Sequence, residues 1–141
     1  MSGIKRKLII YMSILLLCVA CGREKPPLEF APSPSIIEKA LIFKLEYQQE
    51  SLSRQLRLKK PNFIIKKINV TKIEPTIVFN LPTYHLEGTY KVKIKQNTLK
   101  NVLIDNTFNL DLQRQSRGKT WRILLKLEGK KPLEYLSYLI H

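Results

Sequence analysis

The spacing of apolar residues changes along the chain, and each change marks a boundary between predicted elements. Leu8 to Ala20 is an almost unbroken apolar run. After a proline-rich stretch, apolar residues recur at helical spacing, which predicts a helix over residues 35–58. The members of this apolar stripe are Ile37, Leu41, Leu45, Leu52 and Leu56. From Phe63 onward the period falls from 3.6 to 2, which is typical of strands.

The ends of the predicted helix have their own signals. Ser35 and Glu38 have the spacing of a capping box, in which the serine oxygen accepts from the backbone N–H of residue 38 and the glutamate reaches back. Pro61 lies beyond the last apolar residue of the stripe and stops the helix. The sequence therefore predicts one long helix with one buried side.

Four strands are predicted after the helix, with prolines and turns between them. They follow Phe63 to Ile73, Tyr84 to Lys95, Ile104 to Leu112, and Trp121 to Leu127. Thr76 to Phe79, bracketed by two prolines, is either a connection or a short edge strand. Pro132 to Ile140 is expected to form a last short helix or strand that covers an edge of the sheet.

Two hairpin registers follow from matching apolar positions. A turn at Ser116 to Lys119 places Leu112 opposite Ile123, Leu110 opposite Leu125, and Arg114 opposite Trp121, where a cation–π contact is expected. If Tyr90 faces Phe108, then Leu86 faces Leu112, His85 faces Gln113 and Glu87 faces Asp111. Both registers keep apolar residues on one face of the sheet.

The predicted fold class is α+β, with one N-terminal helix packed on a four-stranded antiparallel meander sheet. In the order and size of its elements this resembles the cystatin-like arrangement, in which a curved sheet wraps a helix. The resemblance is one of architecture: the motifs that make cystatins protease inhibitors are absent, so it implies no inhibitor activity.

The N-terminus carries a basic segment, Met1 to Lys7, ahead of the apolar run. The run is shorter than the roughly 20 residues that span a bilayer but suits a secretory signal. Its last residues, Val19-Ala20-Cys21, resemble the bacterial lipoprotein signal, which implies cleavage before Cys21 and a lipid on that cysteine. Cys18 stands where the family usually has leucine. An uncleaved signal anchor or a buried apolar helix is the alternative.

The chain is thus divided into a lipoprotein signal peptide, residues 1–20, a lipidated cysteine with a proline-rich tether, residues 21–34, and a single α+β domain, residues 35–141. Several acyl chains would hold the protein durably on its membrane. The expected location is the cell envelope. Gly22 follows the cysteine where aspartate would favour inner-membrane retention, so the outer membrane is favoured if the host has one.

Charge and cysteine content narrow the possible functions. The formal net charge is +14, of which the residues before the apolar run contribute three. Such an excess favours long-range attraction to anionic partners. Both cysteines, Cys18 and Cys21, belong to the leader, so the domain has no disulfide, thiol nucleophile or thiolate metal site.

One candidate site lies on the polar face of the predicted sheet. His85, Glu87, Asp111, Gln113 and Arg122 are brought together there by the predicted registers. Two neighbouring carboxylates can separate their pKa values into an acid and a base, and a histidine beside them can move protons. The alternative is a solvated polar face on which the arginine offsets the acids.

A second candidate is the lysine row Lys91, Lys93 and Lys95 along one strand face. It can bind anionic lipid, a polysaccharide or an acidic envelope protein, or it can simply keep sheet edges from aggregating. Nucleic acid is disfavoured, because the leader exports the domain and the aromatics lie on the other face. Those aromatics, among them Tyr84 and Trp121, form core or line a ligand cavity.

No zinc-binding pattern, phosphate loop or nucleophile elbow is present, so we expect no catalytic residue, metal or cofactor. The favoured hypothesis is a non-enzymatic lipoprotein that binds an anionic surface or protein partner or serves in assembly. A small-ligand-binding or hydrolytic domain around His85, Glu87 and Asp111 is the alternative. Three segments of the mature chain carry a further likeness: Leu81-Pro82-Thr83-Tyr84-His85, Gln113-Arg114-Gln115 and Gly118-Lys119-Thr120-Trp121-Arg122. In these the chain resembles small uncharacterised cyanobacterial lipoproteins, and the resemblance implies no activity.

Overall fold

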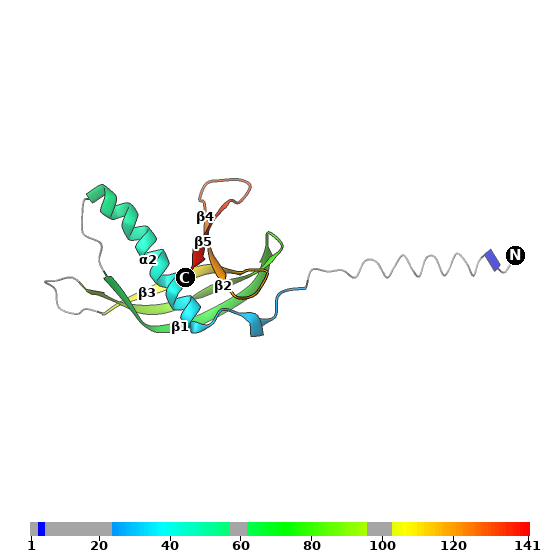
Figure 1. The fold of residues 1–141 in the computed structure, drawn as a ribbon, viewed down its shortest axis with the longest axis horizontal. Helices are drawn as coiled ribbons and strands as arrows, with labels where there is room; N and C mark the ends of the chain where they lie inside the picture. Colours follow the sequence, from blue (N-terminus) through cyan, green and yellow to red (C-terminus); the bar gives the residue numbers. More distant parts are fainter. Residues whose placement is uncertain (1–2, 5–23, 57–61, 96–102) are drawn as a thin grey trace.

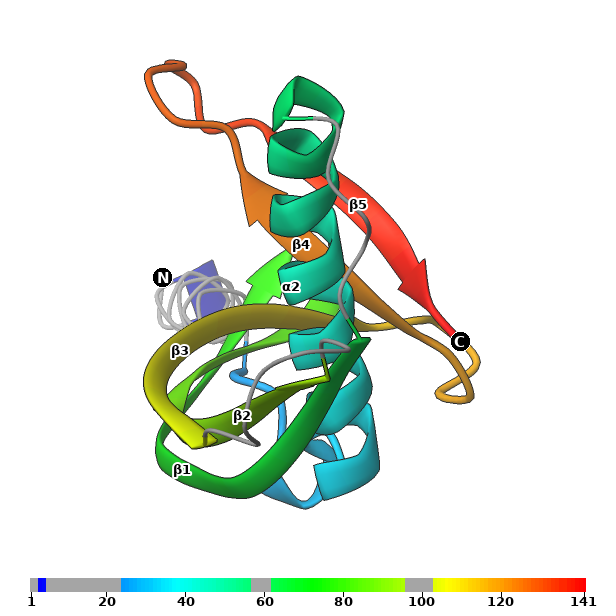
Figure 2. The ribbon, with the colours of Figure 1, turned by 90° about the vertical axis from the view of Figure 1, so that its left-hand side faces the viewer.

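A helix crosses a curved antiparallel sheet in the computed structural model, which describes residues 3–4, 24–56, 62–95 and 103–141. Figure 1 shows β1, β2 and β3 beneath α2 and the β4–β5 hairpin rising beside it, and Figure 2 shows the curvature of the first three strands. The elements are η2 Leu28–Phe30, α2 Pro34–Leu56, β1 Asn62–Val78, β2 Leu81–Lys95, β3 Leu103–Arg114, β4 Trp121–Lys126 and β5 Tyr135–Ile140. The predicted α+β class is confirmed.

The start of α2 differs from the predicted capping box. Ser33, not Ser35, provides the cap: its hydroxyl oxygen accepts from the N–H of Ile36 at 3.4 Å, and its carbonyl accepts from the N–H of Ile37 at 3.1 Å. Pro34 then occupies the first helical position, where its missing N–H costs nothing. The prediction was wrong because it overlooked this favourable proline and placed the cap two residues late.

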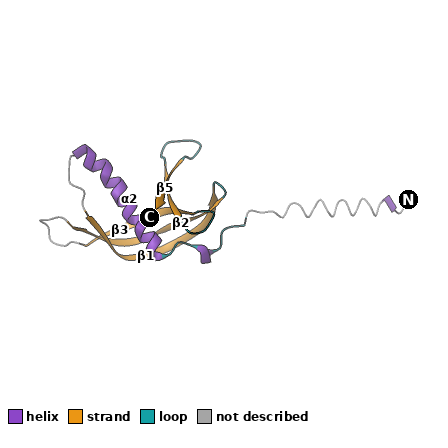
Figure 3. Cartoon of the chain, viewed as in Figure 1, coloured by secondary structure: helices purple, strands orange, loops and turns teal. Residues whose placement is uncertain are grey.

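The apolar stripe of α2 is buried only over its first half. Ile37, Ala40 and Leu41 pack into the core, whereas Leu52 is 50% exposed. In Figures 1 and 3 the later turns of the helix rise away from β1, β2 and β3. The helix is therefore fixed to the sheet through its N-terminal half.

The sheet has five strands in the order β1-β2-β3-β4-β5, one more than predicted. The added strand is β5, which pairs along its whole length with β4, from Trp121 opposite Ile140 to Lys126 opposite Tyr135. The sequence had predicted either a helix or a strand for residues 132–140, and the structure shows the strand. The first strand is also longer than predicted, because it continues through Pro75 to Val78. An edge strand tolerates this proline, since its missing N–H need not reach a neighbour.

Alternation along β2 places its apolar residues in the core, as predicted. Tyr84 and Leu86 are fully buried and Val92 nearly so. Phe108 and Trp121 join them from β3 and β4. The predicted interpretation of these aromatics as core is confirmed, although Tyr90 and Phe108 also contribute to the wall of a cleft described below.

The two predicted registers have different outcomes. In the β3–β4 hairpin, Leu112 faces Ile123 and Arg114 faces Trp121, as expected, while the predicted Leu110–Leu125 pair lies beyond the end of the ladder. Between β2 and β3 the prediction was wrong by two residues, because Gly88, not Tyr90, faces Phe108.

Gly88 explains the observed register of β2 against β3. A Cβ at this position would lie 2.8 Å from Phe108 Cζ and would also clash with the backbone oxygen of Asn69. β1 has irregular pairing on both sides of this point, between Lys66 and Asn69 and between Val70 and Lys72. The absence of a side chain at Gly88 thus admits both the aromatic ring and the bulged strand.

Residues 24–33, which we call the docked segment, lie against the domain. Pro26 and Pro32 are buried, and Tyr84 Oη donates a hydrogen bond of 2.7 Å to the carbonyl of Pro27. The guanidinium of Arg114 stacks on Phe30, with its Cζ 4.7 Å from the ring centroid, instead of on Trp121 as predicted. Much of the stretch expected to be a tether is therefore fixed to the sheet.

Candidate functional site

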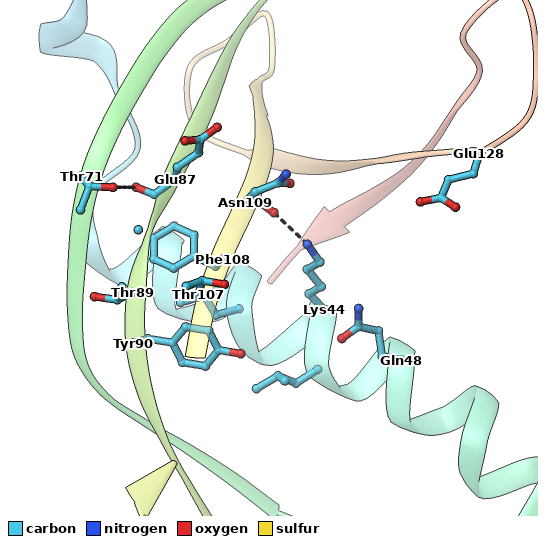
Figure 4. Close-up of a pocket in the computed structure, with 13 residues that line it drawn as sticks. Lys44, Gln48, Thr71, Glu87, Thr89, Tyr90, Thr107, Phe108, Asn109 and Glu128 are labelled. Carbon is cyan, nitrogen blue, oxygen red and sulfur yellow. Dashed lines mark hydrogen bonds between the residues drawn. The ribbon is translucent and has the colours of Figure 1, made fainter. Parts of the chain in front are cut away.

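The sheet divides between β3 and β4. Their pairing begins at Asp111 opposite Leu124, so the earlier part of β3 pairs with β2 alone. At the division, Lys44 Nζ donates to the backbone oxygen of Asn109 at 2.8 Å, as Figure 4 shows. The helix thus supplies a donor to a strand carbonyl that has no β4 residue paired with it.

A cleft of about 700 Å³ lies at this division (Figure 4). Lys44 and Gln48 of α2 form one side, Tyr90 and Phe108 lie along the sheet, and Glu128 lies on the β4–β5 connection. Burial lowers the pKa of the Lys44 amine, and the negative charge of Asp111 opposes this effect only in part. The cleft is mainly polar, and its lysine was not predicted from the sequence.

His85, Glu87 and Asp111 come together on the outer face of the sheet, although not in the predicted pairing. Glu87 also lines the cleft. His85 faces Asp111 and Glu87 faces Asn109 across the β2–β3 ladder. His85 Nδ1 lies 2.8 Å from Asp111 Oδ1, and His85 Nε2 lies 3.0 Å from Glu87 Oε1. Both ring nitrogens are therefore engaged by carboxylates.

Electrostatics at this cluster favour a charged histidine. Burial disfavours the imidazolium, but the hydrogen bonds and charges of Glu87 and Asp111 outweigh burial and raise the pKa of His85 above its usual value. The hydrogen bond from His85, with help from Lys72, lowers the pKa of Glu87. The three side chains thus form one hydrogen-bonded network in which both carboxylates contact the histidine ring.

A second hollow, of about 550 Å³, lies beside the cluster. His85 and Asp111 line it with Glu74, Lys25, Lys126 and Tyr135. Lys126 Nζ is 3.9 Å from Asp111 Oδ2. Within the ranges that the structure describes, no group of three or more His, Cys, Asp or Glu residues is arranged to hold a metal ion. The hollow can accept hydrogen-bonding ligands, and Lys25 and Lys126 are contributors that sequence reasoning missed.

Gln113 and Arg122, the other predicted members, do not join this network. Gln113 is buried, and its amide donates to the carbonyl of Val78 at 2.8 Å. Arg122 does face Gln113 across the hairpin, but its guanidinium bonds Ser137, with Nε 2.6 Å from Oγ and Nη2 2.9 Å from the carbonyl oxygen. The prediction did not take account of Ser137, which β5 places beside Arg122.

The lysine row lies on the outer face near the far end of β2. Lys91 is opposite Lys66 of β1 and forms a 3.2 Å ion pair with Asp105 of β3. Lys93 is opposite Ile64. The side chain of Lys95 lies outside the described residues. We call Lys66, Lys91 and Lys93 the lysine face.

Cys21 and the apolar run before it lie outside the described residues, so the predicted lipidation stays a prediction. Among the helices that the structure describes, none has both the length and the apolar character needed to cross a membrane. Comparison of the chain with protein-family models, curated proteins and solved structures found no match.

Proposed function

We propose that this protein is a membrane-anchored lipoprotein of the cell envelope whose domain binds an anionic partner without catalysis. The Val19-Ala20-Cys21 signal supports export and attachment of lipid to Cys21. The outer membrane is the favoured destination if the host has one. An anionic polysaccharide or an acidic envelope protein fits the charge of the domain, and nucleic acid is disfavoured by export.

The observation that carries the binding proposal is the pairing of Lys66 with Lys91. Like charges directly opposite each other on neighbouring strands destabilise a sheet. Asp105 compensates only part of this face, because it pairs with Lys91 and is itself 80% exposed. An anionic partner that bridges the two lysines would offset their repulsion. The charge of this face therefore favours binding of an anion.

Charge reversal tests this proposal. We expect Lys91→Glu with Lys93→Glu to abolish binding of the full chain to the polyuronate alginate, and wild-type binding to weaken as salt is added. Lys130→Glu with Lys131→Glu is the matched control, since it makes the same change of charge on the β4–β5 connection. Equal binding by the two double variants would show that the lysine face is not the binding surface. Crosslinking in the native membrane would then identify the partner.

For the fold, we propose the cystatin-like arrangement. The support is α2 lying across a curved antiparallel meander, with α2 ahead of all five strands in the chain. The fifth strand extends the sheet beyond the four that were expected. The proposal concerns architecture and brings no protease inhibition.

The hollow beside His85 favours a second candidate function, the binding of a small polar ligand. A flat outer face would have argued against it, whereas His85 and Asp111 border a concave site of about 550 Å³. Ligand pockets commonly measure about 300–1,000 Å³. A fragment screen by NMR should give shifts that Asp111→Asn removes. Shifts that persist in that variant would exclude this hollow.

A further inference from the structure

The docked segment lies against one end of the sheet, where it contacts Tyr84 and Arg114. The β1–β2 turn, the β3–β4 turn and the docked segment all lie at this end, which we call the anchor end (Figure 1). Three peptide steps separate Cys21 from Glu24, the first residue of the docked segment, and they span at most about 11 Å. A lipid on Cys21 would therefore place the anchor end beside the bilayer.

Large apolar side chains are exposed at the anchor end. Phe79 in the β1–β2 turn is 70% exposed, and Leu28 and Phe30 of the docked segment are 58% and 46% exposed. Phe79 lies edge-on to Tyr135, with ring centroids 6.0 Å apart. On a surface that binds a membrane, Phe and Leu side chains bury at the boundary between the lipid headgroups and the acyl chains.

Exposed cations accompany these apolar residues. Lys25 is on the docked segment, and Arg117 and Lys119 are in the β3–β4 turn. Glu24 and Glu29 of the docked segment offset part of their charge. Each cation near an anionic bilayer adds to the attraction between the protein and the membrane. Apolar and basic groups thus occur together at the end nearest the anchor.

The lysine face lies toward the other end of the same strands. Nine residues separate Tyr84, which holds the docked segment, from Lys93, and a strand of that length spans about 30 Å. We propose that the anchor end is a membrane-contact surface, with Phe79 and Leu28 at headgroup level, so that the lysine face points away from the anchoring bilayer. This inference rests on the proposed lipidation of Cys21, and it favours a partner in the envelope space over lipid for the lysine face.

Tryptophan quenching by brominated lipids tests this orientation. Phe79→Trp places a reporter at the anchor end, and Leu103→Trp, at a 49% exposed residue opposite Lys93, is the matched control. In vesicles of brominated phosphatidylcholine and phosphatidylglycerol, the full acylated protein should lose most of the added emission of Phe79→Trp and little of that of Leu103→Trp. The unsubstituted protein gives the Trp121 background.

Each outcome has a distinct meaning. Equal quenching of both variants, or stronger quenching of Leu103→Trp, would overturn the proposed orientation. An unquenched Phe79→Trp would also overturn it, and with a dimer in size-exclusion chromatography would assign the anchor end to a second copy of the chain. Intact mass separately tests the anchor: a Cys21 without acyl groups contradicts the proposed anchorage, while the quenching pattern of the full chain added to the same vesicles still decides the contact surface.

Discussion

The two faces of β2 carry residues of opposite character in alternation. On the inner face Tyr84, Leu86 and Val92 are buried against α2 and the neighbouring strands. On the outer face His85 and Lys91 contact the carboxylates of Asp111 and Asp105 on β3. The inner face is constrained by volume, because interiors are close-packed, whereas the outer face is constrained by charge, which solvent screens. Substitutions on the two faces should therefore differ in kind as well as in size.

The largest effect is expected from Gly88→Ala on the inner face. The added methyl group would meet the Phe108 ring and the backbone of β1, and overpacking of this kind costs roughly 1–3 kcal/mol or more. Urea unfolding would measure the loss of stability. Thr89→Ala, one residue along on the outer face, is the control and should change stability by less than about 0.5 kcal/mol. Equal unfolding midpoints for the two variants would contradict the packing argument.

Gly88 also shows why the faces of the sheet were predictable and the β2–β3 register was not. A slip of one residue exchanges the two faces and is excluded by the apolar pattern, but a slip of two leaves every residue on its own face. The β3–β4 hairpin did not have this freedom, since a short turn with Gly118 at φ 67° joins its strands. The remaining sequence signal for the β2–β3 register was Gly88, because a residue without a side chain leaves room for the ring of Phe108 opposite it.

The same distinction applies to the candidate sites. The prediction that His85, Glu87 and Asp111 lie together was correct, because all three are on the same face of neighbouring strands. The two-residue error had placed Gln113, and not Asp111, opposite the histidine. Lys44 and Lys25 could not be anticipated, because each reaches its site from an element distant in sequence. Contacts of that kind depend on the tertiary arrangement and leave no local pattern.

An intermediate effect, dependent on pH, is expected from His85→Gln on the outer face. The raised pKa of His85 means that its ion pairs stabilise the fold fully below the unfolded value near 6.5 and that this contribution is lost as pH rises through the higher folded value. The lowered pKa of Glu87 has the opposite sign: its contribution is present above about 4.5 and is lost as pH falls through the lower folded value.

The difference in unfolding free energy between wild type and His85→Gln should therefore be greatest between about pH 4.5 and 6.5 and should decline toward pH 8. Urea unfolding across this range measures it. Gln115→Ala, in the β3–β4 turn, serves as a control without a titrating partner. A difference that grew from pH 6 to pH 8 would show that the histidine is held neutral.

The smallest effect, and the sharpest test of the outer face, is expected from Lys66→Thr. This change removes the lysine that faces Lys91 and should raise stability by about 0.2–0.5 kcal/mol, the size of a cross-strand charge contribution. Lys93→Thr makes the same replacement opposite Ile64, so it includes the strand preference of threonine without relief of repulsion. Both variants should lose affinity for alginate, but only Lys66→Thr should become more stable through the removal of charge repulsion. A face that binds an anion keeps like charges together, and their repulsion lowers the stability of the fold. Equal gains in stability for the two variants would mean that the Lys66–Lys91 pair does not destabilise the sheet.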